Sequence, residues 1–292
     1  MLTRIDHVMI CVRDLAAAQK SYSERLGFHI YPGGDHPGRG THNSIGFFDT
    51  DYLELLGVRD HSELERVQGS TLLDFLRKSD GLRFFILASD DIDQDVSAVR
   101  SRGLDISEVV AGSRRTPQGT ELSWRFATLG PRNPLPFFFI QHLTPDDQRQ
   151  AQAPQRAPHP NGSLGIDHVA VAVPDLAAAA GEYQQALGMP ASRTRRDAIL
   201  NAQVVSFPVG RMALLLAAPE VGLGPAQEAL DLRGPGPFLV AFRTASLGAA
   251  ERWALSHHIP ISALGTTAEG TRALLTLPEL AHGVWMEWVD RG

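Results

Sequence analysis

Residues 5–27 read IDHVMICVRDLAAAQKSYSERLG, and residues 166–188 read IDHVAVAVPDLAAAAGEYQQALG. The two stretches share IDHV, DLAAA, a tyrosine and a closing Leu-Gly pair, each offset by 161 residues. An internal repeat of this length predicts two copies of one structural unit. It also places His7 and His168 at the same point of the first expected strand of each copy.

The pattern around each copy predicts a strand, a helix and further strands. In the first copy, β-branched residues at 6–12 indicate a strand, Asp14 is a good N-cap, and Gly27 suits a helix C-terminus. Three short strands are then expected at 28–31, 42–48 and 52–58. The order is therefore β-α-β-β-β.

The same order can be traced three more times, more weakly. The expected strands are 82–88, 121–129, 136–142, 165–173, 202–208, 211–218, 237–243 and 284–289, and the expected helices are 91–102, 175–187 and 246–257. The fold class predicted is α+β, with four βαβββ modules paired into two curved sheets. Each pair would have helices outside and a concave inner face.

Composition sets the domain boundaries and excludes several classes of protein. Residues 144–164 are rich in Pro, Gln, Ala and Asn, which is typical of a linker between domains 1–143 and 165–292. A net charge of −6 argues against a general nucleic-acid binder. The sequence has no long apolar run and no signal peptide pattern, so no membrane partner and a cytoplasmic location are expected. The single cysteine, Cys11, excludes an internal disulfide.

The opening motif, the segment GDHPGRGTHN at 34–43 and the strand YLELL at 52–56 resemble the vicinal oxygen chelate superfamily, in particular its glyoxalase-like domain proteins. This superfamily includes glyoxalase I, extradiol dioxygenases and bleomycin-type resistance proteins. The resemblance implies two glyoxalase-like domains with a divalent metal at the bottom of a concave sheet. Its ligands come from the first and last strands of each module.

Carried over residue by residue, the resemblance implies a metal site in the first half made by His7, Glu54 and Gln141. The metal would be Zn, Fe, Mn, Co or Ni. Phe84 stands where the second module would supply a first-strand ligand. An alternative second site uses His168 and Glu287, with Ala213 and Leu239 at the remaining ligand positions.

Each of these residues also has a structural interpretation. A strand histidine can be a hydrogen-bonded interior residue, and Glu54 or Glu287 can pair with an arginine such as Arg125 or Arg39 instead of a metal. The glycine-rich segment 33–43 can be a tight turn, or a cavity rim on which Arg39, His42 and Asn43 bind substrate. Cys11, flanked by apolar strand residues, is expected to be inert.

The function predicted is a metal-dependent lyase or isomerase acting on a small molecule with adjacent oxygens, with Glu54 as the catalytic proton carrier. Two alternatives remain. One is a metal-free protein that sequesters a small molecule, and the other is an extradiol-type dioxygenase. The expected partner is a small-molecule ligand, and the chain is expected to be a monomer or a homodimer.

Overall fold

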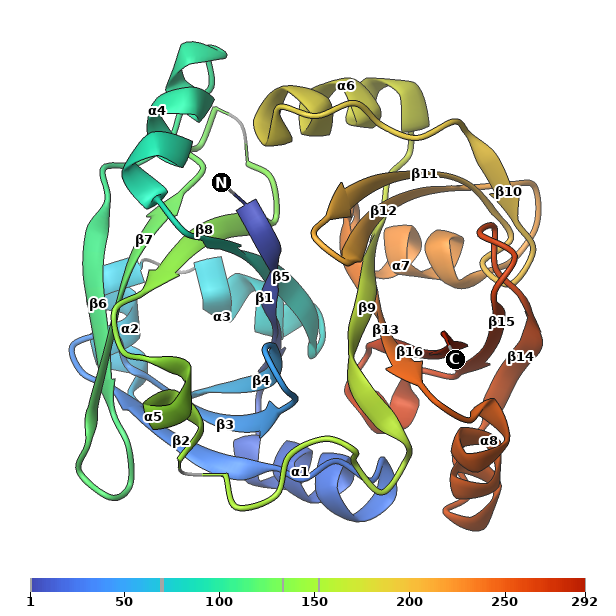
Figure 1. The fold of residues 1–292 in the computed structure, drawn as a ribbon, viewed down its shortest axis with the longest axis horizontal. Coiled ribbons are helices and arrows are strands. Elements are labelled where there is room, and N and C mark those ends of the chain that lie inside the picture. The colour runs from blue at the N-terminus through green and yellow to red at the C-terminus, as the bar shows by residue number, and fades with distance from the viewer. Residues whose placement is uncertain (1, 69–70, 133, 152, 292) are drawn as a thin grey trace.

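The structure is a computed structural model that describes residues 2–68, 71–132, 134–151 and 153–291 (Figure 1). The strands of the first half are β1 (Leu2–Val12), β2 (Tyr31–His36), β3 (Thr41–Phe47), β4 (Tyr52–Val58), β5 (Gly81–Ser89), β6 (Val110–Arg115), β7 (Glu121–Thr128) and β8 (Phe137–His142). Its helices are α1 (Leu15–Lys20), continued by the π-helix η1 (Ser21–Arg25), then α2 (His61–Gln68), α3 (Thr71–Lys78) and α4 (Ile92–Ser101). A short helix, α5 (Asp146–Gln150), follows.

The second half repeats this plan. Its strands are β9 (Ser163–Ala172), β10 (Arg195–Asp197), β11 (Ala202–Val209), β12 (Met212–Pro219), β13 (Gly236–Thr244), β14 (Ile261–Thr266), β15 (Arg272–Thr276) and β16 (Trp285–Asp290). Its helices are α6 (Leu176–Leu187), α7 (Pro225–Arg233), α8 (Leu247–Ser256) and the 3₁₀ turn η2 (Glu279–Ala281). None of the described helices is long and apolar enough to span a bilayer.

The predicted fold class is confirmed: the chain is α+β and forms two curled eight-stranded sheets. The second-half sheet is open, with the order β10-β11-β12-β9-β13-β16-β15-β14. The first-half sheet goes further and closes into a barrel, because β2 pairs with β6 at Asp35 and Arg115. This closure turns the expected concave face into an interior.

The repeated helix signals form as expected. The Asp14 carboxylate accepts from the Ala17 amide at 2.9 Å, and the Asp175 carboxylate accepts from the Ala178 amide at 3.0 Å. Each helix start therefore has one of its unpaired amides satisfied. Gly27 and Gly188 follow their helices with φ of +74° and +70°, a conformation that glycine adopts at little cost.

The elements that the sequence pattern missed include α2 and α3, which cover one end of the barrel. Leu64 of α2 and Leu72 and Leu76 of α3 are buried in one cluster with Cys11 and Leu56. Burial raises the pKa of the Cys11 thiol to about 12, so it stays protonated. The expectation that Cys11 is inert agrees with this position.

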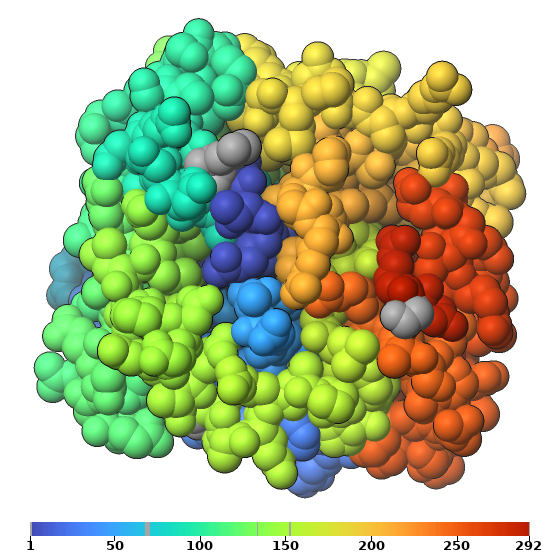
Figure 2. All heavy atoms as spheres, viewed as in Figure 1, coloured from blue at the N-terminus to red at the C-terminus, as the bar shows by residue number. Residues whose placement is uncertain are grey.

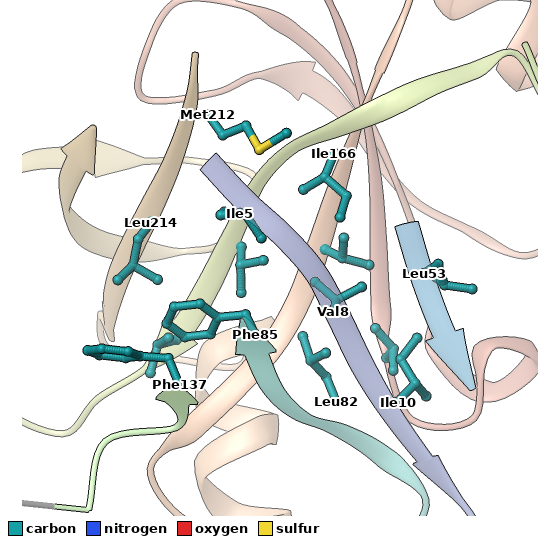
Figure 3. Close-up of a cluster of buried hydrophobic side chains, with 14 of the residues drawn as sticks. Ile5, Val8, Ile10, Leu53, Leu82, Phe85, Phe137, Ile166, Met212 and Leu214 are labelled. Atoms are coloured by element: carbon teal, nitrogen blue, oxygen red, sulfur yellow. The ribbon is translucent and has the colours of Figure 1, made fainter. Parts of the chain in front are cut away.

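The two halves share one apolar core. Ile5, Val8 and Phe85 of the first half lie in the same cluster as Ile166 and Leu214 of the second (Figure 3). Figure 2 shows the first-half and second-half surfaces in direct contact along this face of the molecule. The halves are thus packed back to back, with the two sheet interiors facing away from each other.

The segment between β8 and β9 does more than connect the halves. It contains α5, and its residues Arg149, Gln150, His159 and Asn161 are buried. Asn161 donates to the Leu26 carbonyl at 2.7 Å, and His159 accepts from the His29 amide at 3.0 Å. The composition is typical of a linker, and these hydrogen bonds hold the segment against the first half.

Candidate functional site

The barrel of the first half encloses a cavity of about 120 Å³. One part of its lining is polar and includes His7, His36, Asn43, Glu54 and His142. The rest is made of apolar and aromatic side chains together with three arginines: Met9, Phe47, Tyr52, Leu122, Trp124, Phe126, Phe138, Ile140, Arg39, Arg114 and Arg149.

Glu54 lies at the centre of the polar part. Its Oε1 accepts from Asn43 Nδ2 at 2.6 Å, and its Oε2 lies 3.5 Å from His7 Nε2. His36 Nε2 is 3.9 Å from Oε1. The structure therefore brings the predicted residues His7, Glu54 and Asn43 together. It supports neither arginine partner considered for Glu54, since Arg125 pairs with Asp93 at 2.7 Å and Arg39 lies over the Phe126 ring.

The backbone of β1 adds Asp6 to this cluster. The pairing of β1 with β5 shifts by one residue across Asp6, because Ile5 pairs with Leu87 and His7 with Ile86. Such an irregularity redirects a side chain that alternation would send to the other face. Asp6 Oδ1 lies 2.8 Å from His7 Nδ1 and 3.0 Å from His142 Nε2. Both Asp6 and His142 were missed by sequence reasoning, although the repeated Asp-His pair was a usable signal.

The contacts set the charges of the cluster. Burial opposes ionisation of Asp6, but His142 and His7 outweigh it and hold the Asp6 pKa well below its usual range. Burial likewise opposes the charged form of His7, but its hydrogen bonds to Asp6 and Glu54 raise the His7 pKa. Burial would raise the pKa of Glu54, yet His7, His36 and Asn43 lower it to about 2. These shifts favour an imidazolium beside a carboxylate in the cavity.

The other two cavity histidines are neutral. Burial lowers the pKa of His36 and of His142. Because the Asp6 carboxylate is an acceptor, His142 Nε2 donates to it, and His142 Nδ1 is then an unprotonated acceptor. That buried nitrogen has no hydrogen-bond partner among the described residues. It is available to a ligand.

Gln141 and His42 lie outside the cavity. Gln141 Nε2 donates to the Asp90 carbonyl at 2.8 Å on the outer side of β8, because Phe138, Ile140 and His142 are the inward residues of that strand. The expectation that Gln141 completes a metal site with His7 and Glu54 is therefore wrong, since its side chain lies outside the cavity. His42 alternates with the inward-facing Asn43 and contacts the backbone position of Gly57, away from the cavity. Arg39 and Asn43 do line it.

Strand register shows which residues occupy the ligand positions of the second module. The first strands of the two modules, β1 and β5, pair antiparallel, with His7 opposite Ile86 and Met9 opposite Phe84. The two-fold relation between the modules exchanges His7 with Phe84 and Met9 with Ile86, so Phe84 is the counterpart of His7. Met9 pairs with Glu54 in the parallel β1–β4 ladder, and Ile86 pairs with Phe138 in the parallel β5–β8 ladder. The counterpart of Glu54 is thus Phe138, not Gln141. Two phenylalanines replace the donors of the second module, and their rings are 6.1 Å apart.

The second half holds its own pair. His168 Nε2 lies 3.1 Å from Glu287 Oε2, and His168 Nδ1 lies 2.9 Å from Asp167 Oδ2, so Glu287 pairs with this histidine and not with an arginine. Here the register makes Leu215, and not Ala213, the counterpart of Glu54, because Ala170 pairs with Leu215. Glu287 is 1% exposed. Its carboxylate is covered, whereas Asp167 and His168 line a cavity of about 730 Å³ in the second half.

The His168 pair predicts a pH-dependent stability. Burial opposes protonation of His168, but Asp167 and Glu287 raise its pKa from 6.5 to about 9. The resulting stabilisation is complete below the unfolded pKa and is lost as pH rises from about 6.5 to 9, which amounts to roughly 3 kcal/mol. Urea unfolding at several pH values should show this decline, and the variant His168→Gln should flatten it. An unchanged slope in the variant would contradict the assignment.

The fold and site define a class: a paired βαβββ protein with a polar cluster inside one curled sheet. The family described as "Glyoxalase-like domain" matches residues 5–187, and the "Glyoxalase/Bleomycin resistance protein/Dioxygenase superfamily" matches residues 165–276. Since the first match covers more than half of the chain, the protein belongs to the glyoxalase-like domain family, as the sequence resemblance indicated. A comparison with curated protein sequences finds no match.

Solved structures share the fold over the whole chain. A hypothetical protein from Staphylococcus aureus is 14% identical with a TM-score of 0.70, and the match covers 99% of both chains. A variant of 4-hydroxymandelate synthase from Streptomyces coelicolor is 15% identical with a TM-score of 0.65, covering 99% of this chain and 92% of that one. The Mn(II)-bound glyoxalase from Novosphingobium aromaticivorans is 15% identical with a TM-score of 0.61, covering 99% and 82%. At these identities the likeness concerns the fold alone.

Proposed function

We propose that the first-half cavity is the active site of a lyase or isomerase that moves a proton on a small molecule with adjacent oxygens. The observation that carries this proposal is the Glu54 carboxylate facing the same enclosed space as the His7 imidazolium, with 3.5 Å between Oε2 and Nε2. A proton carrier and an electrophile side by side are what enolate chemistry requires.

Each residue has a role in that step. Glu54 takes a proton from the carbon next to a substrate carbonyl, and the electron pair moves onto the carbonyl oxygen. The His7 Nε2–H hydrogen-bonds that oxygen as its charge develops, and Glu54 then returns the proton. When the substrate oxygen accepts from His7, Glu54 loses part of the interaction that lowers its pKa, and it becomes a stronger base. Asn43 and Asp6 hold the two groups in place.

A divalent metal would act as a Lewis acid on the substrate oxygens. The residues present do not fit a cage of three or more ligands, because Phe84 and Phe138 fill the second-module positions. No cluster of three or more His, Cys, Asp or Glu side chains in the described ranges could hold a metal. The extradiol-type reaction fits least, since its second histidine position is Phe84 here and Leu239 in the other half. The proposed step therefore uses the chain's own groups.

Sequestration without chemistry is the competing function, and the aromatic lining supports ligand binding in either case. A pocket that only binds has little use for two buried carboxylates and an imidazolium, which are costly to remove from water. Asp167, His168 and Glu287 form a similar cluster in the second half, but Glu54 lines its cavity and Glu287 does not line the cavity beside His168. The exposure of the Glu54 carboxylate to a ligand favours an enzyme.

Hydrogen exchange in D₂O tests the proposed chemistry. Hydroxyacetone, 2-oxobutanoate and phenylpyruvate would be incubated with the protein, and loss of the signal next to the carbonyl would be followed by proton NMR. We expect the protein to accelerate exchange of at least one of them. A protein that binds such compounds and accelerates none of them would be a sequestering protein.

Removal of metal ions with a chelator tests separately whether the reaction needs a metal. After dialysis against EDTA and removal of the chelator, we expect the exchange rate and the thermal stability to be unchanged. Elemental analysis before dialysis should find well under one transition metal per chain. A rate that falls on chelation and returns with Mn²⁺ or Zn²⁺ would restore the metal-dependent mechanism.

A further inference from the structure

We infer that the ligand of the first-half cavity is a small organic carboxylate with an aromatic or apolar body, recognised by Arg39 and Arg149. This inference rests on the proposed function for the location of the site and names the class of its ligand.

Charge is the first argument. Three arginines line the cavity, and Glu54 is the acidic residue of the described lining. Asp6 and Glu54 both contact His7, at 2.8 and 3.5 Å, and Arg149 is paired with Asp146. Arg39 has no acidic partner within ion-pair distance among the described residues, and it lines a largely apolar cavity, where charge interactions are stronger than in water. This environment favours an anion over a neutral ligand or a cation.

Arg39 is the most available of the three. It lies in the turn between β2 and β3, flanked by Gly38 and Gly40 with φ of +73° and +68°, which fix the path of that turn. Its guanidinium carbon is 4.9 Å from the centre of the Phe126 ring. No carboxylate of the described chain lies within ion-pair distance of it. A guanidinium stacked on a ring and lacking an acidic partner is suited to bind a carboxylate in two-point fashion.

Arg149 reaches the cavity from outside the barrel strands. It belongs to α5, whose Gln150 donates to the Asp49 carbonyl between β3 and β4 at 2.7 Å, and its side chain is 5% exposed. Its Nε and Nη2 donate to Asp146 Oδ1 at 3.2 and 2.6 Å. Because Asp146 is itself about half exposed, this pair is partly screened by water and serves mainly to hold the guanidinium in position.

The volume of the cavity and its aromatic lining indicate the apolar part of the ligand. A cavity of about 120 Å³ has the scale of a single ring, since an apolar cavity of about 150 Å³ holds benzene. Trp124, Phe126 and Phe138 supply aromatic faces. Nucleotides exceed this volume. An aromatic or short branched carboxylic acid matches both the arginine side chains and the aromatic lining of the cavity.

Calorimetric titration with benzoate, acetate and benzyl alcohol tests the inference on the intact chain. Benzoate should bind more tightly than either of the others, because only benzoate has both the ring and the charge. Arg39→Gln and Arg149→Gln should each weaken benzoate by about tenfold or more and leave benzyl alcohol within about twofold. Arg39→Lys should recover part of the loss, and Arg132→Gln, at an exposed arginine, is the matched control.

The outcomes separate this inference from the proposed function. Benzoate that binds no better than benzyl alcohol, or that keeps its affinity in Arg39→Gln, would overturn the carboxylate site and leave the proton transfer intact. Glu54→Gln should keep benzoate binding, since Arg39 and Arg149, and not Glu54, bind the carboxylate of the ligand. Hydrogen exchange that survives Glu54→Gln would overturn the proposed function and leave the carboxylate site standing.

Discussion

Replacing Glu54 with glutamine should lower the rate of substrate hydrogen exchange by about 10²- to 10⁴-fold, the usual contribution of a positioned acid–base group. The amide is nearly the same size as the carboxylate, so the cavity keeps its shape. It cannot take a proton from carbon, however, and it removes one of the two carboxylates that raise the pKa of His7. Exchange rates in D₂O at saturating substrate measure the effect.

The second half offers a matched control for this substitution. Glu287 pairs with Ala241 in the parallel β13–β16 ladder, as Glu54 pairs with Met9 in the parallel β1–β4 ladder. Glu287 also forms an ion pair with a strand histidine, His168. Glu287→Gln should lower stability but change the exchange rate of the folded protein by less than about threefold. Equal losses of rate in the two variants would mean that the chemistry does not reside in the first half alone.

Truncating Phe242 to alanine should cost about 3–5 kcal/mol of unfolding free energy. Phe242 lies on β13 of the second half and is fully buried, yet its ring is 5.1 Å from Phe28 and 5.7 Å from Phe48 of the first. Because the rings bridge the halves, the loss should destabilise both. Urea unfolding followed by circular dichroism should show one transition, shifted as a whole.

The control is an apolar residue outside this core. Leu264 on β14 is 51% exposed, and its truncation to alanine should change the unfolding free energy by less than about 1 kcal/mol. Two separate transitions, with only the second-half transition shifted by Phe242→Ala, would show that the halves fold independently and that the shared core contributes little.

The parts of the fold that could be predicted were those with strong local signals. The Asp14 and Asp175 caps, the Gly27 and Gly188 ends and the order of elements around them are determined by residues close in sequence. Barrel closure at Asp35 depends on contacts between distant strands. Pattern alone does not specify such pairings, so a curved sheet was expected and a closed barrel was not.

The residues of the site that could be predicted also have a local signal in the sequence. His7 and Glu54 were found because they belong to a repeated motif and to an apolar strand. On β8, the predicted ligand position Gln141 is three residues away from Phe138, the counterpart of Glu54. An aromatic run such as 137–139 gives no clue to the strand register. His142 and Asp6 depend on that register and on the irregularity in β1, and Arg149 lies in a segment whose composition suggested a linker.

The most direct test of the first-half site is nitrogen NMR of the protein with ¹⁵N-labelled histidine during titration with phenylpyruvate. His7→Gln and His168→Gln variants would identify the two strand imidazoles. The account predicts that the His7 ring resonances shift and saturate with the ligand, while those of His168 stay in place. A titration that moves His168 and leaves His7 unchanged would contradict it.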